Sequence, residues 1–595
     1  MAGYWTRTIA SRRYARRKFL AGAAGVGAGA LALGMIGCRG DGDGRESGGG
    51  SGLLSKGVDS TKEAKPGGNL VLAKPVDVLN IDPMTAADFL ADFPSFLVSS
   101  RLVKYKSGTI DSPPVGDPEG DAADSWELSP DHLTLTFKLR NGLKFEPQAP
   151  VNGRDVTIDD VNYSWTQFSA THVARSNFLN SVNPDSPVLS LQTPDARTVV
   201  FKLKQPFVPI VSMFGAARGF VIVPKEAADK YNPRSEAHGS GPFMLTKYTP
   251  SVGFEYQRNP NWYMKDRPFF ETISMPIIRE YAQQLAQFES GAVWQFTPRP
   301  EDMIAVKKRH PQMRLLGTGW DAAYPIAHSM DWKTGSPFRD VRMRRALSML
   351  IDRDLWIETF NDVEKYRSEG IELQTRWHSH FGAGDEKLWL DPKSGKLGEG
   401  SQYFKFNQAE AKKLISAAGS DGLEFPILWT GGTRDREIQV FSQMWRQNGG
   451  LNPTLKPLSR DERVTVCNVG GGKADGICGD LASGSGVDVD LWLDTRVRYG
   501  AGPYVPYTEP LPIIDDLCKA QKTEFDDKKR KDILLEIQKQ MAVQMVSIPW
   551  PGLAESLGMS WPWLGNYGYV LPQNGGFPAT EAYVHYWYDQ SKKTV

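Results

Sequence analysis

The segment DHLTLTFKLRNGLKF, residues 131–145, alternates apolar and polar side chains over residues 133–139. Such alternation predicts a β-strand with one buried face and one solvated face. Asn141 and Gly142 follow directly, and this pair is typical of a tight hairpin turn. The segment therefore predicts a strand of a half-buried sheet.

Helices and further strands are predicted on both sides of this segment. Residues 199–204 indicate another strand, and residues 340–350 and 409–418 indicate helices, the second of which ends at Gly419. The clearest helix covers residues 526–541, with one apolar stripe formed by Ile533, Leu534, Ile537 and Met541. Mixed helices and strands favour an α/β or α+β fold.

Short motifs flank the segment in a fixed order. They are GGNLV (67–71), NIDP (80–83), AADSWE (122–127), PVNGRDV (150–156), GSGPF (239–243), RNPNWY (258–263), PFRDVRMRRA (337–346), IDR (351–353), AEAKKL (409–414), DKKR (527–530) and IP (548–549). In this order the motifs resemble those of family 5 of the extracellular solute-binding proteins, the peptide/nickel type of ABC importer. The resemblance extends over most of residues 67–560.

The resemblance implies an α/β fold with two lobes, the type II periplasmic-binding-protein-like fold, and an extra domain on the first lobe. We expect lobe 1 at residues 67–305, with the extra domain at about 100–200, and lobe 2 at 306–555. A tail, residues 556–595, is expected to return to lobe 1. Trp126 and Phe145, which lie in or beside the motifs, are expected in the core rather than at the ligand.

The resemblance also implies a function. It predicts the substrate-binding component of an ABC importer, which captures a solute outside the cytoplasm and delivers it to a membrane permease. No covalent chemistry and no cofactor are expected. The alternatives are an exported hydrolase and a stand-alone receptor or chaperone on the same fold. The hydrolase is the weaker alternative, because the sequence contains no Gly-x-Ser-x-Gly, His-Glu-x-x-His or P-loop motif.

The composition is that of an ordinary globular protein. Hydrophobic residues make up 40% and charged residues 23% of the 595 residues. The 70 basic and 69 acidic residues give a net charge of +1, so no basic field indicates a nucleic-acid partner. We expect a monomer.

The N-terminus predicts export and anchoring. Residues 1–18 are basic and contain Arg16 and Arg17 in a twin-arginine-like context, and residues 19–37 carry no charge. Cys38 ends this run in a context that resembles a lipobox, which implies cleavage before Cys38 and acylation of its thiol. Residues 39–66 then predict a flexible tether. The expected location is the outer face of the membrane or the periplasm; the alternative is an uncleaved anchor helix.

Three further cysteines lie in the C-terminal part of the chain. Cys467 and Cys478 are in a glycine-rich segment, and a disulfide between them would close a loop. The alternative is three free thiols, including Cys518. Their spacing does not match a zinc site.

The resemblance implies a solvated pocket between the lobes, with contacts from four regions. In the first, Asp88 is a candidate acceptor for a ligand donor, or else a helix cap. In the second, Trp320 and Tyr324 offer flat apolar area, or else belong to the core. In the fourth, Arg376, beside Trp377, is a candidate clamp for a carboxylate, or else a solvated surface arginine.

The third region, residues 480–492, departs from the family pattern. Peptide-binding members carry an acid there that holds the amino terminus of the peptide. In this chain Ser485 takes its place, and Asp480 or Asp488 is the candidate substitute. Without a substitute, a buried α-amine would be unpaired, which is costly. With Trp492 as a stacking ring, two ligand classes stay open: an oligopeptide, or an uncharged polar solute such as an oligosaccharide.

His378 and His380 stand two residues apart, and the family includes nickel importers. No third ligand is evident near them in the sequence. We therefore expect a pair of solvated loop histidines and predict no metal site.

Overall fold

The computed structural model describes residues 52–78, 80–85, 96–112, 116–216, 219–320, 326–432, 434–468, 474–481, 489–493, 497–499, 509–571 and 579–593. All of them belong to the unit that spans residues 50–595. Among these residues, no helix combines the length and the apolar character that a membrane crossing needs.

The first lobe contains a four-stranded sheet, ordered β1-β13-β12-β11. Its strands are β1 (Asn69–Val71), β11 (Phe243–Thr249), β12 (Gly253–Arg258) and β13 (Thr272–Pro276). β1 pairs parallel to β13, and the other pairs are antiparallel. Leu70, Phe254 and Ile273 are fully buried in the core that this sheet shares with the next elements.

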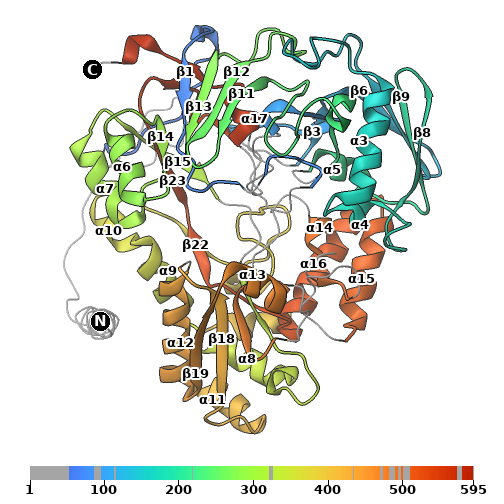
Figure 1. Cartoon of the computed structure of the whole chain (residues 1–595). Coiled ribbons are helices and arrows are strands. Elements are labelled where there is room, and N and C mark those ends of the chain that lie inside the picture. The colour runs from blue at the N-terminus through green and yellow to red at the C-terminus, as the bar shows by residue number, and fades with distance from the viewer. Residues whose placement is uncertain are drawn as a thin grey trace, which may run out of the picture. The chain divides into compact units, whose positions relative to one another are not determined.

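A second sheet forms an insertion within this lobe, ordered β6-β7-β9-β8 and antiparallel throughout. Its strands are β6 (Ala123–Leu128), β7 (Thr134–Leu139), β8 (Val188–Asp195) and β9 (Thr198–Leu203). The alternating segment thus forms β7, and the turn after it has Gly142 at φ +65°. Figure 1 shows helix α3 (Ile158–Thr171) beside this sheet.

The insertion has a hydrophobic core of its own. Phe137, Phe168 and Phe201 are fully buried in it, and Trp126 packs against it from its edge. Phe145 is also fully buried. The expectation that Trp126 and Phe145 are core residues is therefore consistent with the structure.

The second lobe contains a five-stranded sheet, ordered β19-β18-β20-β16-β21. Its strands are β16 (Ala327–Met330), β18 (Glu424–Thr430), β19 (Asn452–Leu458), β20 (Ile477–Leu481) and β21 (Ile548–Pro549). β18 runs parallel to β19 and β20, whereas β16 runs antiparallel to β20 and β21.

Three helices of this lobe begin and end close to the predicted limits. They are α8 (Val341–Met349), α11 (Gln408–Ala417) and α16 (Asp527–Gln544). Helices α12 (Asp435–Gly449) and α15 (Pro512–Thr523) were not predicted from the sequence. Asp340 caps α8 and Asp526 caps α16, each by accepting a backbone N–H at 2.8 Å. Leu534, Ile537 and Met541 form the buried stripe of α16.

The chain crosses between the two lobes by way of short strands. The first crossing leaves β15 (Arg314–Gly319) and leads to β16. The second leaves β21 and passes through β22 (Gly552–Ala554) to β23 (Ser556–Ser560), which pairs with β14 (Gln295–Phe296) and β15. In Figure 1, β22 lies between the sheet of β23 and the sheet of β18.

The C-terminal part of the chain contacts the first lobe. β25 (Val570–Leu571) pairs with β4 (Gly108–Thr109), and Glu581 of α17 (Ala579–Tyr583) forms an ion pair with Arg101. These contacts support the expected return of the tail, and the domain limits themselves stay predictions.

Part of the expected tether is held on the first lobe. Ser55 donates its N–H to the carbonyl of Leu315 at 2.7 Å, and Ser60 bonds to Asn566 through both its N–H and its hydroxyl. Leu53 packs against the hydrophobic core. The expectation of a flexible tether up to residue 66 is therefore wrong for these residues, because an apolar side chain and a set of hydrogen bonds fix them.

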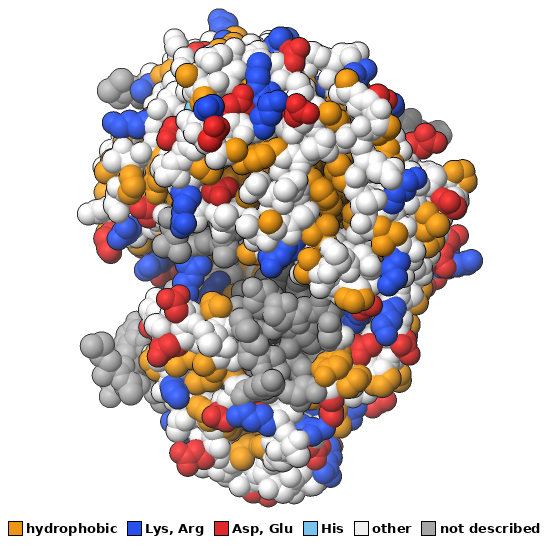
Figure 2. Space-filling view, turned by 45° about the vertical axis from the view of Figure 1, so that its right-hand side comes forward, with side chains coloured by type: hydrophobic (Ala, Val, Ile, Leu, Met, Phe, Trp, Pro, Cys, Tyr) orange, Lys and Arg blue, Asp and Glu red, His pale blue; other side chains and the backbone are white. Residues whose placement is uncertain are grey.

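Charges of both signs mix on the surface. On the face shown in Figure 2, Lys and Arg side chains are interspersed with Asp and Glu rather than gathered in one patch.

Candidate functional site

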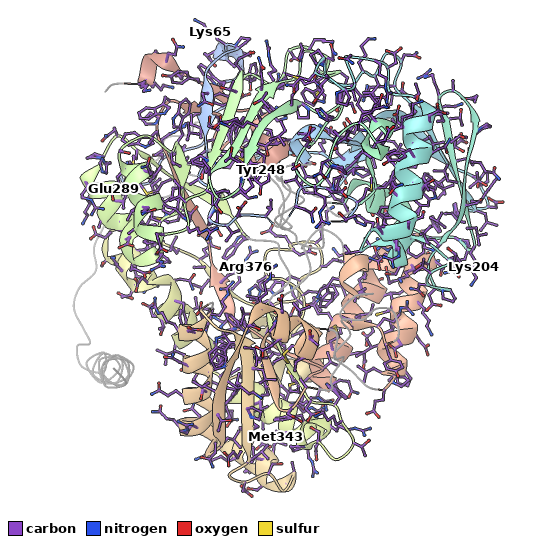
Figure 3. The ribbon with its side chains drawn as sticks, in the orientation of Figure 1. Lys65, Lys204, Tyr248, Glu289, Met343 and Arg376 are labelled. Carbon is purple, nitrogen blue, oxygen red and sulfur yellow. A yellow bond between two sulfur atoms is a disulfide. The ribbon has the colours of Figure 1, made fainter. Side chains whose placement is uncertain are left out.

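Arg376 and Trp320 meet where the chain crosses between the lobes. Trp320 follows directly after β15, and Arg376 lies on β17 (Thr375–Trp377), which pairs with β22 of the second crossing. The Arg376 guanidinium carbon lies 4.0 Å from the centroid of the Trp320 ring. Figure 3 shows Arg376 between Tyr248 of the first lobe and Met343 of the second. The structure thus brings together two residues from separate predicted regions.

Close strand pairing sets the position of Arg376. β17 pairs antiparallel with β22, with Trp377 opposite Gly552. A Cβ atom at residue 552 would lie 2.1 Å from the Arg376 carbonyl oxygen, so only glycine allows this approach.

The residues that follow β17 hold the guanidinium in place. Arg376 donates from Nη1 to the Ala383 carbonyl at 3.0 Å and from Nη2 to Glu386 Oε1 at 2.9 Å. Its guanidinium also lies 5.2 Å from the ring centroid of Trp389. Two of its five N–H donors therefore have partners among the described residues, and the others can serve a planar anion such as a carboxylate.

Trp377 points the other way, because successive side chains of a strand lie on opposite faces. Its ring is buried, and its Nε1 donates to Asp354 Oδ1 at 2.8 Å. Lys393 Nζ lies 4.6 Å from its ring centroid. The structure therefore places Trp377 within the protein and not beside the Arg376 guanidinium.

Asp480 already has partners on the protein. Arg463 of α13 (Arg460–Arg463) donates from Nε to Asp480 Oδ1 at 3.1 Å, and both side chains are almost fully buried. The N–H of Thr430 lies 3.3 Å from the other carboxylate oxygen. Asp480 thus neutralises a buried arginine, and it is poorly placed to substitute for the family acid.

A disulfide lies close to Asp480 in the sequence. Cys467 and Cys478 are joined, and Cys478 lies on β20 two residues before Asp480. The question that the sequence left open is therefore answered in favour of the disulfide. Cys518 is buried and does not take part in this disulfide.

Trp492, on α14 (Val489–Trp492), is only 7% exposed and belongs to the core beneath α15 and α16. Its ring meets that of Phe381 edge to face, with centroids 5.2 Å apart. The structure does not bring it to Arg376. Asp88, Tyr324, Ser485, Asp488 and Cys38 lie outside the described residues.

Comparison with known proteins places the chain in a family. Residues 117–475 match the bacterial extracellular solute-binding proteins, family 5 Middle, and this match covers more than half of the chain. The chain belongs to family 5 of the bacterial extracellular solute-binding proteins. The family and the two-lobed fold that the motifs predicted are therefore confirmed.

Two relatives of this family 5 protein are named as peptide-binding proteins. The probable D,D-dipeptide-binding periplasmic protein DdpA of Escherichia coli K12 is 28% identical over 301 residues, which are 49% of this chain and 54% of DdpA. Di/tripeptide-binding protein 1 of Pseudomonas aeruginosa is 24% identical over 513 residues, which are 81% of this chain and 88% of that protein. The chain spans about half the length of several curated relatives that it matches.

A solved structure has the same fold. The periplasmic binding protein DppA of Helicobacter pylori, in complex with the peptide STSA, superposes with a TM-score of 0.70 at 17% identity. The match covers 89% of this chain and 99% of DppA.

The two histidines of this family 5 protein are not solvated, contrary to expectation. His378 and His380 are 8% and 2% exposed. His380 Nε2 lies 2.9 Å from the Ser547 carbonyl, and His378 Nδ1 accepts the N–H of Ala383 at 3.1 Å. Burial lowers the pKa of each to about 3. Among the described residues, no group of three His, Cys, Asp or Glu side chains could hold a metal ion.

Sequence reasoning missed Glu386 and Trp389, which orient Arg376. Both lie in the polar loop after β17, within 13 residues of Arg376. The sequence signal that could have indicated them is an acid and an aromatic residue shortly after Arg376, the candidate clamp for a carboxylate.

Proposed function

We propose that this protein is the substrate-binding component of an ABC importer and that it delivers a captured solute to a membrane permease. Membership of family 5 supports this role, and the family consists of binding proteins rather than enzymes. The observation that carries the proposal is the Arg376 guanidinium, stacked on Trp320 where the chain crosses between the lobes. A hinge at this place is suited to domain closure around a ligand.

The proposed ligand is a short peptide or a related solute that carries a carboxylate. Arg376 provides a fixed cation with donors to spare, and Trp320 and Trp389 provide flat faces beside it. Because Asp480 is engaged with Arg463, we assign the anchoring role to the carboxylate of the ligand rather than to its amine. A ligand that binds the closed arrangement more tightly than the open one favours closure by that difference in affinity.

Arg376→Gln is expected to weaken peptide binding about tenfold to a hundredfold, since hydrogen bonds to charged groups contribute about 1.5–3 kcal/mol. Trp320→Ala is expected to weaken it as well, without unfolding the protein. The measurement is native mass spectrometry of the full chain with a pool of di- to tetrapeptides, each offered with a free C-terminal carboxylate and as its C-terminal amide. Wild type should retain the free acids, and Arg376→Gln should no longer distinguish them from the amides.

Arg342→Gln is the matched control. Arg342 is exposed and is paired with Asp340 at 2.6 Å on the second lobe, so its loss should leave peptide binding unchanged. Equal retention of acids and amides by wild type would contradict the role of Arg376. Retention of none of these peptides would favour the uncharged class of solute.

We further propose that the protein is a monomer held at the outer face of the membrane by a lipid on Cys38. A lipid chain contributes about 0.8 kcal/mol for each buried methylene, and stable anchoring needs more than one chain. Cys38→Ala is therefore expected to move the protein from the membrane fraction to the soluble fraction of the producing cells. Cys518→Ala, at a buried thiol, is the control and should leave the distribution unchanged. Continued membrane association of Cys38→Ala would overturn the lipid anchor.

A further inference from the structure

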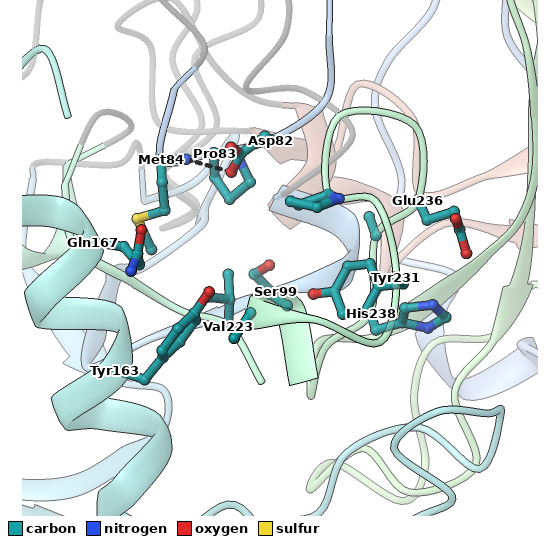
Figure 4. A pocket seen from close by; sticks show the side chains of 14 residues that line it. Asp82, Pro83, Met84, Ser99, Tyr163, Gln167, Val223, Tyr231, Glu236 and His238 are labelled. Atoms are coloured by element: carbon teal, nitrogen blue, oxygen red, sulfur yellow. Dashed lines mark hydrogen bonds between the residues drawn. The ribbon is translucent and has the colours of Figure 1, made fainter. Parts of the chain in front are cut away.

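A cavity of about 300 Å³ lies in the first lobe, away from Arg376. Helix α3 lines one side, and the segment that contains His238 lines the other. Figure 4 shows the polar side chains that face it: Asp82, Ser99, Tyr163, Gln167, Tyr231 and His238. Cavities of this size are at the lower end of those that bind small molecules.

A buried, hydrogen-bonded pair of side chains forms one wall. His238 Nδ1 lies 2.6 Å from Glu146 Oε1, and the two side chains are 8% and 0% exposed. The ring of Tyr231 packs edge to face on the imidazole, with centroids 4.7 Å apart. Glu146 and Tyr231 thus fix the orientation of the ring that faces the cavity.

A second acid is held rigidly at the opposite side. Asp82 is 7% exposed, and its two carboxylate oxygens accept the N–H of Met84 at 2.9 Å and the hydroxyl of Thr85 at 2.7 Å. A carboxylate has about four acceptor positions, so Asp82 can accept more bonds. The fixed geometry means that little ordering is needed when a ligand donor arrives.

Acidic side chains outnumber basic ones among the described residues at the cavity. Asp82 and Glu236 line it, Glu146 lies behind His238, and none of the described lining residues is Lys or Arg. Burial and the nearby acids raise the pKa of Tyr163 and of Tyr231. The two phenol rings add electron-rich faces, which attract cations.

We propose that this cavity binds a small organic ammonium ion, separately from the solute held at Arg376. Asp82 and the hydroxyls of Tyr163 and Tyr231 would accept hydrogen bonds from the ammonium group, while the rings surround its alkyl part. The two places attract opposite charges, because an arginine dominates one and carboxylates dominate the other. The cavity would make the protein responsive to an amine in its surroundings.

Titration calorimetry of the full chain with 1,4-diaminobutane tests this, with 1,4-butanediol as a neutral ligand of the same length. The diamine is expected to bind at least about tenfold more tightly than the diol, as one desolvated charge interaction would require. Gln167→Lys places a cation at the cavity wall on α3 and should abolish binding of the diamine. Thr166→Lys adds the same charge at the exposed neighbouring position and should leave binding within about twofold, because surface charges are screened.

Tyr163→Phe removes one acceptor with little change of volume and should weaken the diamine about threefold to tenfold. Arg376→Gln should bind the diamine as wild type does, which separates this inference from the proposed peptide site. Equal affinity for diamine and diol, no detectable heat, normal binding by Gln167→Lys, or loss of binding in Arg376→Gln would each overturn the proposal.

Discussion

Glu581→Gln is expected to lower the free energy of unfolding by about 3–5 kcal/mol, the cost of leaving a buried charge without its partner. Arg101 donates to Glu581 Oε1 at 2.5 Å, and these side chains are 6% and 9% exposed. Lys104 and the buried Asp121 lie close by, and Lys104 also pairs at 3.2 Å with Glu119, whose side chain is 40% exposed. The substitution leaves the Arg101 charge without its partner in a low dielectric. Urea unfolding followed by tryptophan fluorescence measures the change.

Two controls test whether the lost partner is the cause. Asp532→Asn breaks the exposed pair with Lys528 on α16 and should cost no more than about 0.5 kcal/mol. The double variant Arg101→Met with Glu581→Met should recover most of the lost stability, because well-packed apolar residues often replace a buried ion pair without net cost. Equal losses for Glu581→Gln and Asp532→Asn would show that the pair contributes no more than a surface contact.

Local patterns were enough to predict the family and much of the fold. The alternation over residues 133–139 became β7, and the stripe that begins at Ile533 became the buried face of α16. These predictions succeeded because periodicity records which face of an element is buried, and burial dominates the energy of a strand or helix. The order of the motifs then restricted the chain to one arrangement of lobes.

The candidate site was less accessible to sequence reasoning. Arg463 engages Asp480 from 17 residues away, and Arg101 meets Glu581 from 480 residues away. No local pattern records such pairs, because they depend on how whole elements pack. Arg376 and Trp320 were both proposed, but their contact follows from the pairing of β17 with β22. The prediction that His378 and His380 are solvated was wrong for the same reason. The local sequence indicated a loop, and the burial of these two side chains depends on how distant elements pack around it.

Acid is expected to destabilise the protein through His378 and His380. The folded state holds the pKa of each near 3, because burial disfavours the imidazolium ion, whereas an unfolded histidine has a pKa of about 6.5. As the pH falls below 6.5, the histidines bind protons in the unfolded state but not in the folded state. The free energy of unfolding therefore decreases until the pH reaches about 3. From pH 7 to pH 5 each histidine should cost about 2 kcal/mol, at about 1.4 kcal/mol for each pH unit below 6.5.

Comparison of variants isolates this effect, because buried acids such as Glu146, whose pKa burial raises, act in the opposite direction. His380→Gln keeps a donor for the Ser547 carbonyl but does not titrate. Its unfolding free energy should therefore fall about 2 kcal/mol less than that of wild type between pH 7 and pH 5. Ser379→Ala, between the two histidines, loses a hydrogen bond to Gln538. Its free energy of unfolding should therefore be lowered by the same amount at both pH values. If His380→Gln had the same pH dependence as wild type, His380 would bind a proton in the folded state. The hypothesis that its buried imidazole is neutral would then be wrong.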